Sequence, residues 1–156
     1  MRALTVRQPY AHWLLHELPA TKLPGGELIN IGRKDVENRT WTTAYRGQLL
    51  IHAAARAHDR YGLSMLEPAE RVFSSIIGVV ELVDVHHSST CHGSDAPIGC
   101  SHWGEDGVFH WTTANAHPFA APLSCPGALQ VWDTDRLNYD MQAAVYDELD
   151  KIGARA

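Results

Sequence analysis

The sequence has few cysteines and no long apolar run. Its 156 residues include three cysteines, Cys91, Cys100 and Cys125, and this odd number argues against a disulfide framework. No apolar stretch approaches the roughly 18 residues needed to span a bilayer, which excludes a membrane-spanning role. The opening MRALTVRQPYAHWLL also lacks the continuous apolar segment of a signal peptide. We therefore expect a cytoplasmic protein with reduced thiols and no membrane partner.

Positive charge is scarce as well. Thirteen Lys and Arg residues stand against 18 Asp and Glu residues, which gives a formal net charge of −5 at pH 7. Nonspecific coating of nucleic acid relies on many cations that neutralise phosphates, so this charge excludes that mode of binding. Six cations nevertheless lie between positions 33 and 60, whereas residues 81–110 contain none. Any contact with nucleic acid must therefore be local, on one basic face.

The motifs of several enzyme classes are also missing. The chain has no glycine-rich dinucleotide or phosphate loop, no H-E-x-x-H and no G-x-S-x-G. We therefore expect no cofactor. The length fits a single domain, because domains usually run from about 100 to 200 residues.

The apolar patterns predict short strands among a few helices. Strands are expected at 3–6, 47–54, 74–85, 108–117 and 128–135, with prolines 118, 122 and 126 separating the last two. Helices are expected over 8–18, over 55–73 with a break near Pro68, and from Arg136 onward after a cap at Asp135. Turn residues predict loops over 19–30 and 86–107. Because strands and helices do not alternate regularly, the α+β class with a small mixed barrel is favoured over a doubly wound sheet.

The segment GRKDVENRTW, residues 32–41, concentrates charged side chains. Strict strand alternation would place Lys34 on the opposite side from Glu37 and Arg39, whereas an irregular turn near Lys34 would bring all three into one cavity. Such a cluster can hold a nucleobase or a phosphate, and Trp41 or Tyr45 can add a stacking surface. The alternative is a salt-bridged surface turn with Trp41 in the core, which is the commoner arrangement on composition alone.

The same segment resembles a known family. Gly32, Lys34, Glu37 and Arg39 match G-x-K-x-x-E-x-R, the signature of the ASCH superfamily. Four more segments resemble the family in the same order, namely LTVRQPYAHWLL, NRTWTTAYRGQLLIHAA, IIGVVELVDV and GALQVW. The resemblance covers residues 1–133 and implies a PUA-like β-barrel with surrounding helices and a cleft lined by the signature. Residues 134–156 are then a C-terminal helical extension of the same domain.

The resemblance implies two classes of function. Members of the family are thought to bind RNA or, in some cases, DNA, while others are a ribonuclease or amidohydrolases that deacetylate N4-acetylcytidine. The amidohydrolases resemble this chain at Lys34, where a lysine assists catalysis, but they carry a nucleophilic threonine at the position of Glu37. Thr40 is no obvious substitute for that threonine. In an enzyme, Lys34 would act as a base or electrostatic catalyst and Glu37 as the general base that activates water.

Binding is favoured over catalysis because no nucleophile is evident. In the binding hypothesis, Lys34, Glu37 and Arg39 contact a base that is single-stranded or flipped out, or the base of a modified nucleoside. The full set of predicted ligand-binding residues is Arg7, Gln8, Gly32, Lys34, Glu37, Arg39, Trp41 and Arg46. The sequence specifies neither the ligand, nor the choice between RNA and DNA, nor the oligomeric state.

A second group of chemically active residues lies in the expected loop over 86–107. It consists of His86, His87, Cys91, His92, Cys100 and His102. Thiolates and imidazoles are typical zinc ligands, but a C-x8-C spacing is not that of a zinc ribbon, and adjacent ligands rarely share one ion. We therefore predict no metal and interpret the loop as a polar flap over the cleft, with Trp103 packed beneath it and Cys100 buried. His52 and His110 are expected to be core histidines.

Overall fold

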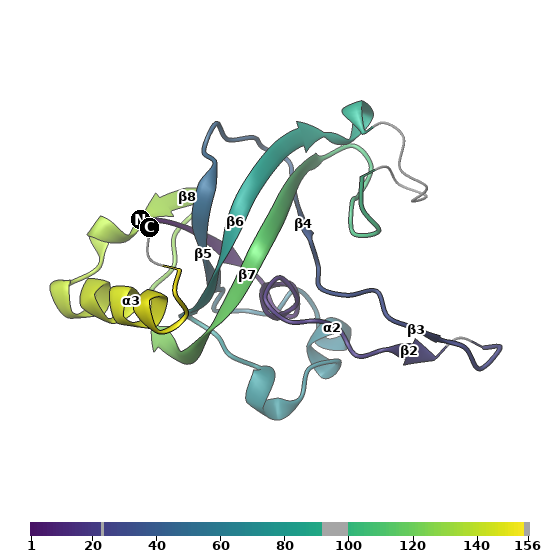
Figure 1. The fold of residues 1–156 in the computed structure, drawn as a ribbon, viewed down its shortest axis with the longest axis horizontal. Coiled ribbons are helices and arrows are strands. Elements are labelled where there is room, and N and C mark those ends of the chain that lie inside the picture. The colour runs from purple at the N-terminus through teal and green to yellow at the C-terminus, as the bar shows by residue number, and fades with distance from the viewer. Residues whose placement is uncertain (23, 92–99, 155–156) are drawn as a thin grey trace.

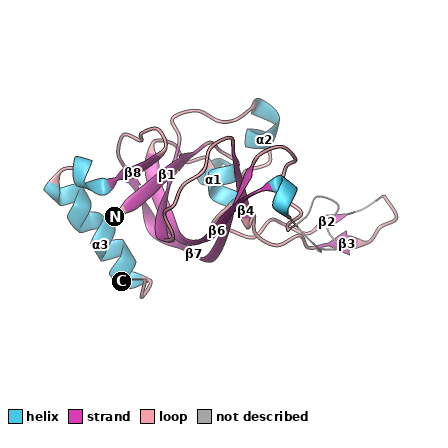
Figure 2. Ribbon diagram, turned by 90° about the horizontal axis from the view of Figure 1, so that it is seen from above, coloured by secondary structure: helices cyan, strands magenta, loops and turns pink. Residues whose placement is uncertain are grey.

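A six-stranded sheet forms the centre of the molecule. The computed structural model describes residues 1–22, 24–91 and 100–154. The strands run in the order β4-β7-β6-β5-β1-β8, and the sheet curls into a half-barrel (Figure 1 and Figure 2). Their bounds are β1 Arg2–Val6, β4 Val36–Arg39, β5 Gly47–Ala53, β6 Ser75–His87, β7 Phe109–Ser124 and β8 Val131–Asp133. β1 and β5 are parallel and the other neighbours antiparallel. This mixed sheet confirms the predicted α+β, PUA-like fold.

Helices surround the sheet. They are α1 (Tyr10–Trp13), α2 (Arg60–Ser64) and α3 (Tyr139–Lys151), with single 3-10 turns at Pro68–Glu70, Ser88–Thr90 and Thr134–Arg136. In Figure 1, α3 lies at one end of the molecule, and the small hairpin of β2 (Thr21–Lys22) and β3 (Leu28–Ile29) extends from the other. None of the helices in the described part of the chain is long and apolar enough to cross a membrane.

Both faces of the sheet are buried. Leu49 and Ile51 of β5 pack in one cluster with α1, whereas Leu50 between them packs in a second cluster with Val145 and Leu149 of α3. This division follows from the two-residue period of a strand, which points successive side chains to opposite faces. A strand buried on both faces is apolar throughout, which explains why GQLLIHA contains no alternation. The C-terminal helix thus covers one face of the same sheet.

Several predicted boundaries are wrong. The helix expected over 8–18 ends at Trp13, because the Trp13 carbonyl accepts a hydrogen bond from the Lys34 amide at 2.9 Å. The segment 55–73 contains only α2 and one 3-10 turn rather than a broken long helix. The hairpin of β2 and β3 also lies in the expected loop over 19–30.

Two further differences concern β7 and α3. β7 continues through Pro118 and Pro122, which were expected to interrupt it, and irregular register against β6 accommodates the run. α3 begins later than expected, since Asn138 rather than Asp135 is its cap and accepts from the Met141 amide at 2.9 Å.

Candidate nucleic-acid interface

An irregular turn leads the signature segment into the sheet. Gly32 has φ +67°, a left-handed conformation that glycine adopts without strain. The guanidinium of the next residue, Arg33, donates to the carbonyls of Leu14, Lys34 and Thr113 at 2.8 Å each, and burial lowers its pKa. The turn is thereby held from inside the protein. β4 begins only at residue 36, so strand alternation does not govern the direction of the Lys34 side chain.

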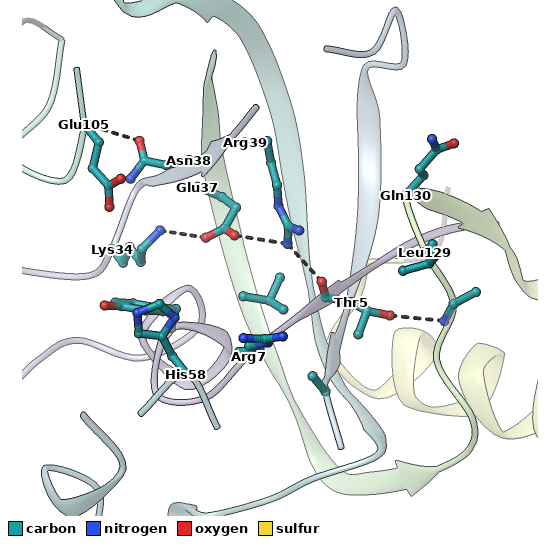
Figure 3. A pocket seen from close by; sticks show the side chains of 14 residues that line it. Thr5, Arg7, Lys34, Glu37, Asn38, Arg39, His58, Glu105, Leu129 and Gln130 are labelled. Carbon is teal, nitrogen blue, oxygen red and sulfur yellow. Dashed lines mark hydrogen bonds and ion pairs between the residues drawn. The ribbon is translucent and has the colours of Figure 1, made fainter. Parts of the chain in front are cut away.

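Lys34, Glu37 and Arg39 form one charged row. Lys34 is 3% exposed, and its Nζ donates to Glu37 Oε2 at 2.7 Å and to the Val36 carbonyl. The other carboxylate oxygen of Glu37 lies 3.1 Å from Arg39 Nη2. Arg39 Nη2 also donates to the Thr5 carbonyl at 2.9 Å. Figure 3 shows this row as a chain of dashed contacts, in which a single carboxylate lies between two cations.

The row lines a cavity of about 480 Å³. Figure 3 shows Lys34, Glu105 and His58 toward one side of it and Leu129 and Gln130 toward the other. The complete lining is Thr5, Val6, Arg7, Tyr10, Lys34, Glu37, Asn38, Arg39, Ala54, His58, Glu105, Ala128, Leu129 and Gln130. The cavity therefore combines charged, aromatic and apolar surfaces.

Tyr10 adds an aromatic wall beside the charged row. Lys34 Nζ lies 5.5 Å from the centroid of the Tyr10 ring, within the range of a cation–π contact. His58 packs edge-on against the same ring at 5.3 Å. Burial raises the pKa of the Tyr10 hydroxyl, and the negative charges of Asp59, Glu105 and Glu37 raise it further. The hydroxyl therefore stays protonated at neutral pH and can donate a hydrogen bond.

One donor of the site is unsatisfied. Arg39 Nε is buried and has no hydrogen-bond partner among the residues that the structure describes. A buried donor without a partner costs about 1–3 kcal/mol. Gln130, on the cavity wall, is a non-glycine residue at φ +59°, which is also unfavourable. Unsatisfied and strained groups of this kind cluster at sites that bind ligands.

Four of the eight predicted ligand-binding residues line the cavity, namely Arg7, Lys34, Glu37 and Arg39. The other four lie elsewhere. Gln8 is buried, and its amide joins the Val72 carbonyl at 2.9 Å to the His12 amide at 3.0 Å. Gly32 forms the turn.

The remaining two, Trp41 and Arg46, are used within the fold. Trp41 packs edge-on against Trp111 at 4.7 Å and belongs to the periphery of the core. Arg46 is exposed and donates to the carbonyls of Thr43 at 3.0 Å and Tyr45 at 2.8 Å. Neither residue lines the cavity.

Sequence reasoning missed several residues of the cavity wall. Thr5 lies two positions before Arg7 at the end of β1, so strand period alone could have indicated it. Glu105 is brought to the cavity by Asn38, whose side chain accepts from the Glu105 amide at 3.0 Å and donates to the Trp103 carbonyl at 2.8 Å. No local pattern marks Glu105, and residues 128–130, expected to begin a strand, instead precede β8 (Val131–Asp133). Only the tertiary fold places both segments at the cavity.

The prediction of a polar flap over residues 86–107 is wrong in one detail, the burial of Cys100. Trp103 packs against Trp13 at 5.8 Å, but Cys100 is exposed rather than buried. His92 lies outside the described residues. His52 and His110 are both buried, as predicted for core histidines.

The curled mixed sheet and its charged cavity define a PUA-like domain. The chain matches the family model of the ASCH domain over residues 21–123, which is more than half of its length, and it therefore belongs to the ASCH domain family. ASCH domains are suggested to bind RNA. No curated protein matches the chain. The matched range contains the whole signature segment.

Proposed function

We propose that this domain binds RNA by accepting one unpaired base, or the base of a modified nucleoside, in the cavity that Lys34, Glu37 and Arg39 line. The observation that carries the proposal is the buried Glu37 carboxylate, fixed between two cations at 2.7 and 3.1 Å. Each carboxylate oxygen has a second lone pair, so Glu37 can still accept from an exocyclic amine of a base. Guanidinium and ammonium groups offer donors to base carbonyls.

The dimensions and the walls of the cavity support a single base as the ligand. A volume of about 480 Å³ is in the range of small-molecule pockets and is too small for a duplex. Proteins recognise RNA sequence mainly through splayed bases that stack on aromatic rings, and Tyr10 and His58 provide rings here. Exposed Arg7 can contact a phosphate, while Leu129, 91% exposed, offers an apolar contact.

The geometry gives less support to hydrolysis. Thr40 is exposed and lies outside the cavity lining. Thr5 does line the cavity, but its hydroxyl oxygen accepts from the Ala128 amide at 3.3 Å and from Trp132 Nε1 at 3.1 Å. Both oxygens of the Glu37 carboxylate are already engaged as acceptors, at 2.7 Å from Lys34 Nζ and 3.1 Å from Arg39 Nη2. An acceptor role in binding fits this carboxylate better than a general-base role.

The proposal is tested by binding of single nucleosides and short single-stranded RNA to purified protein. Lys34→Ala should weaken affinity by about 1.5–3 kcal/mol, as expected for a hydrogen bond to a charged group. Glu37→Gln should change the preference among bases, because the amide is both a donor and an acceptor. Arg46→Ala is the matched control, since this exposed arginine lies outside the cavity.

The outcomes separate the alternatives. If folded Lys34→Ala and Glu37→Gln variants bind every RNA as the parent does, the cluster is structural and the proposal is wrong. If the purified protein turns over N4-acetylcytidine or cleaves RNA, and Glu37→Gln lowers the rate by about 10²–10⁴-fold while affinity is retained, catalysis replaces binding.

A further inference from the structure

Four metal-ligating side chains converge at the end of the β6–β7 hairpin. His86 and His110 are directly opposite each other in the antiparallel register, so their rings lie on the same face of the sheet, 5.5 Å apart. Cys91 follows the 3-10 turn Ser88–Thr90 that ends β6. Cys100 begins the described segment that leads back to β7. The two strands and the two ends of the connection between them therefore contribute one ligand each to the cluster.

The distances suit a tetrahedral ion. His86 Nε2 lies 3.0 Å from Cys91 Sγ, and His110 Nδ1 lies 3.2 Å from Cys91 Sγ and 3.3 Å from Cys100 Sγ. All four ligand atoms are within 4.8 Å of one another. Zinc with two sulfur and two nitrogen ligands requires edges of about 3.3–3.8 Å, given Zn–S and Zn–N bonds of about 2.3 and 2.0–2.1 Å. Small movements would bring all four atoms to that geometry.

Both imidazoles are already oriented as metal ligands. His86 Nδ1 lies 2.7 Å from Asp84 Oδ2, and His110 Nε2 lies 2.7 Å from the Glu105 carbonyl. In the neutral imidazole, the nitrogen that faces the oxygen carries the hydrogen, so the other nitrogen of each ring presents a lone pair to the cluster. Histidine ligands of zinc almost always donate their second nitrogen to a carboxylate or carbonyl in this way.

The backbone is shaped around one of these rings. A Cβ built on Gly104 would lie 2.7 Å from His110 Cε1, so only glycine allows the chain to pass this close to the imidazole. Gly104 thus lets the chain pass close to the imidazole, which places the Glu105 carbonyl where it can accept the hydrogen bond from His110 Nε2. The cluster escapes sequence reasoning because its spacing, H-x4-C-x8-C-x9-H, matches no short metal motif, and strand pairing alone brings its ends together.

We propose that His86, Cys91, Cys100 and His110 bind one zinc ion in a closed, structural Cys2His2 site. This proposal replaces the sequence-based prediction of no metal. Four protein ligands leave no open position for a substrate, which distinguishes a structural from a catalytic zinc. The ion would fix the chain that returns to β7, including Glu105, whose side chain lines the RNA-binding cavity. The site does not depend on the proposed RNA binding.

The test is elemental analysis of protein purified under reducing conditions from zinc-supplemented cells. We expect one equivalent of zinc in the parent protein and its loss in the double variant Cys91→Ser, Cys100→Ser. His87→Ala should keep the metal, because the adjacent strand position points to the other face of the sheet. A parent protein without zinc that also fails to bind added cobalt(II), or a double variant that retains its zinc, would overturn the proposal. A Cys91–Cys100 disulfide in the reduced preparation would do the same.

A second variant keeps all four ligands. Asp84→Asn removes the carboxylate that orients His86 and that also pairs with exposed Arg46 at 3.6 Å. It should lower zinc affinity by about 10–100-fold in a chelator competition, while stoichiometry at excess zinc stays at one. Cobalt(II) bound to the parent should show the strong ligand-to-metal absorption of a tetrahedral thiolate site. Unchanged zinc affinity in Asp84→Asn together with octahedral cobalt spectra would contradict the assigned ligands.

Discussion

At the scale of single residues, the cavity depends most on Glu37. Its carboxylate is the shared partner of Lys34 and Arg39. Glu37→Gln removes that charge and leaves Lys34 buried without a carboxylate, and breaking a buried pair on one side costs about 3–5 kcal/mol. We expect the free energy of unfolding to fall by about this amount in urea denaturation.

The matched control for this change is Arg2→Gln. Arg2 and Asp133 also form an ion pair, at 3.5 Å, but their side chains are 49% and 38% exposed. Exposed pairs contribute only about 0–1 kcal/mol. Equal losses in the two variants would show that burial of Lys34 is not what makes Glu37 important.

His52 makes stability depend on pH. Its Nε2 lies 2.9 Å from the Cys125 carbonyl and its Nδ1 is buried without a partner in the described structure, so burial lowers the pKa of His52 below the ordinary 6.5. Below pH 6.5 the unfolded state therefore binds more protons than the folded state, and the free energy of unfolding decreases as pH falls toward the lowered pKa. Above pH 6.5 this contribution is complete and constant.

The pH dependence is checked by urea denaturation at pH values on both sides of 6.5. His52→Asn should reduce the loss of stability below that pH relative to the parent. His12 and His16, whose pKa values burial also lowers, should leave part of the slope in place. A variant with the same pH dependence as the parent would refute the role of His52.

At this scale the sequence predicted the residues that are adjacent in the chain. Lys34, Glu37 and Arg39 fall within six positions, so their chemistry was visible before folding. Glu105 was not predictable as a wall residue, because only its bond with Asn38 brings it to the cavity. Gln8 does not line the cavity, and in sequence a buried amide that satisfies backbone groups cannot be distinguished from one that contacts a ligand.

At the scale of elements, α3 belongs to the same core as the sheet. A helix after residue 135 was predictable from its apolar period, and Val145 and Leu149 of α3 are buried. The end of α1 was not predictable, since a hydrogen bond from Lys34, about twenty positions away, determines it. The presence of α3 thus follows from the apolar pattern of its own residues, whereas the end of α1 depends on a residue that is distant in the sequence.

Leu149→Ala tests whether α3 and the sheet fold as one unit. Leu149 is 1% exposed, and truncation of a buried leucine costs about 2–5 kcal/mol. We expect a single thermal transition at a lower midpoint than in the parent. Near-ultraviolet and far-ultraviolet circular dichroism should both report this same transition. Asp147→Ala, at an exposed position of the same helix, should change stability little. Two separate transitions in the leucine variant would mean that residues 134–156 do not share the domain.

At the scale of the whole molecule, net charge limits how the proposed RNA ligand can bind. With a net charge of −5, we expect at most the three cations that line the cavity, Arg7, Lys34 and Arg39, to neutralise phosphates. Each phosphate contact to a single strand contributes about 0.7 to the slope of log affinity against log salt, so three give a slope of about −2. We expect fluorescence anisotropy in a salt series to show this shallow dependence. A slope typical of six to ten contacts would contradict a local cavity.

The prolines of β7 have a consequence for the molecule as a whole. A half-barrel has open edges, and β4 pairs with β7 only from Phe109 to Thr112, leaving the later part of β7 without a described strand on that side. Pro118 and Pro122 lie in that part and are exposed. A proline has no amide hydrogen to offer another strand, so Pro118 and Pro122 make this edge a poor template for edge-to-edge aggregation. The double variant Pro118→Thr, Pro122→Thr should therefore increase light scattering during refolding. The same prolines that made this part of β7 look like a loop in the sequence would then protect it from pairing with other molecules.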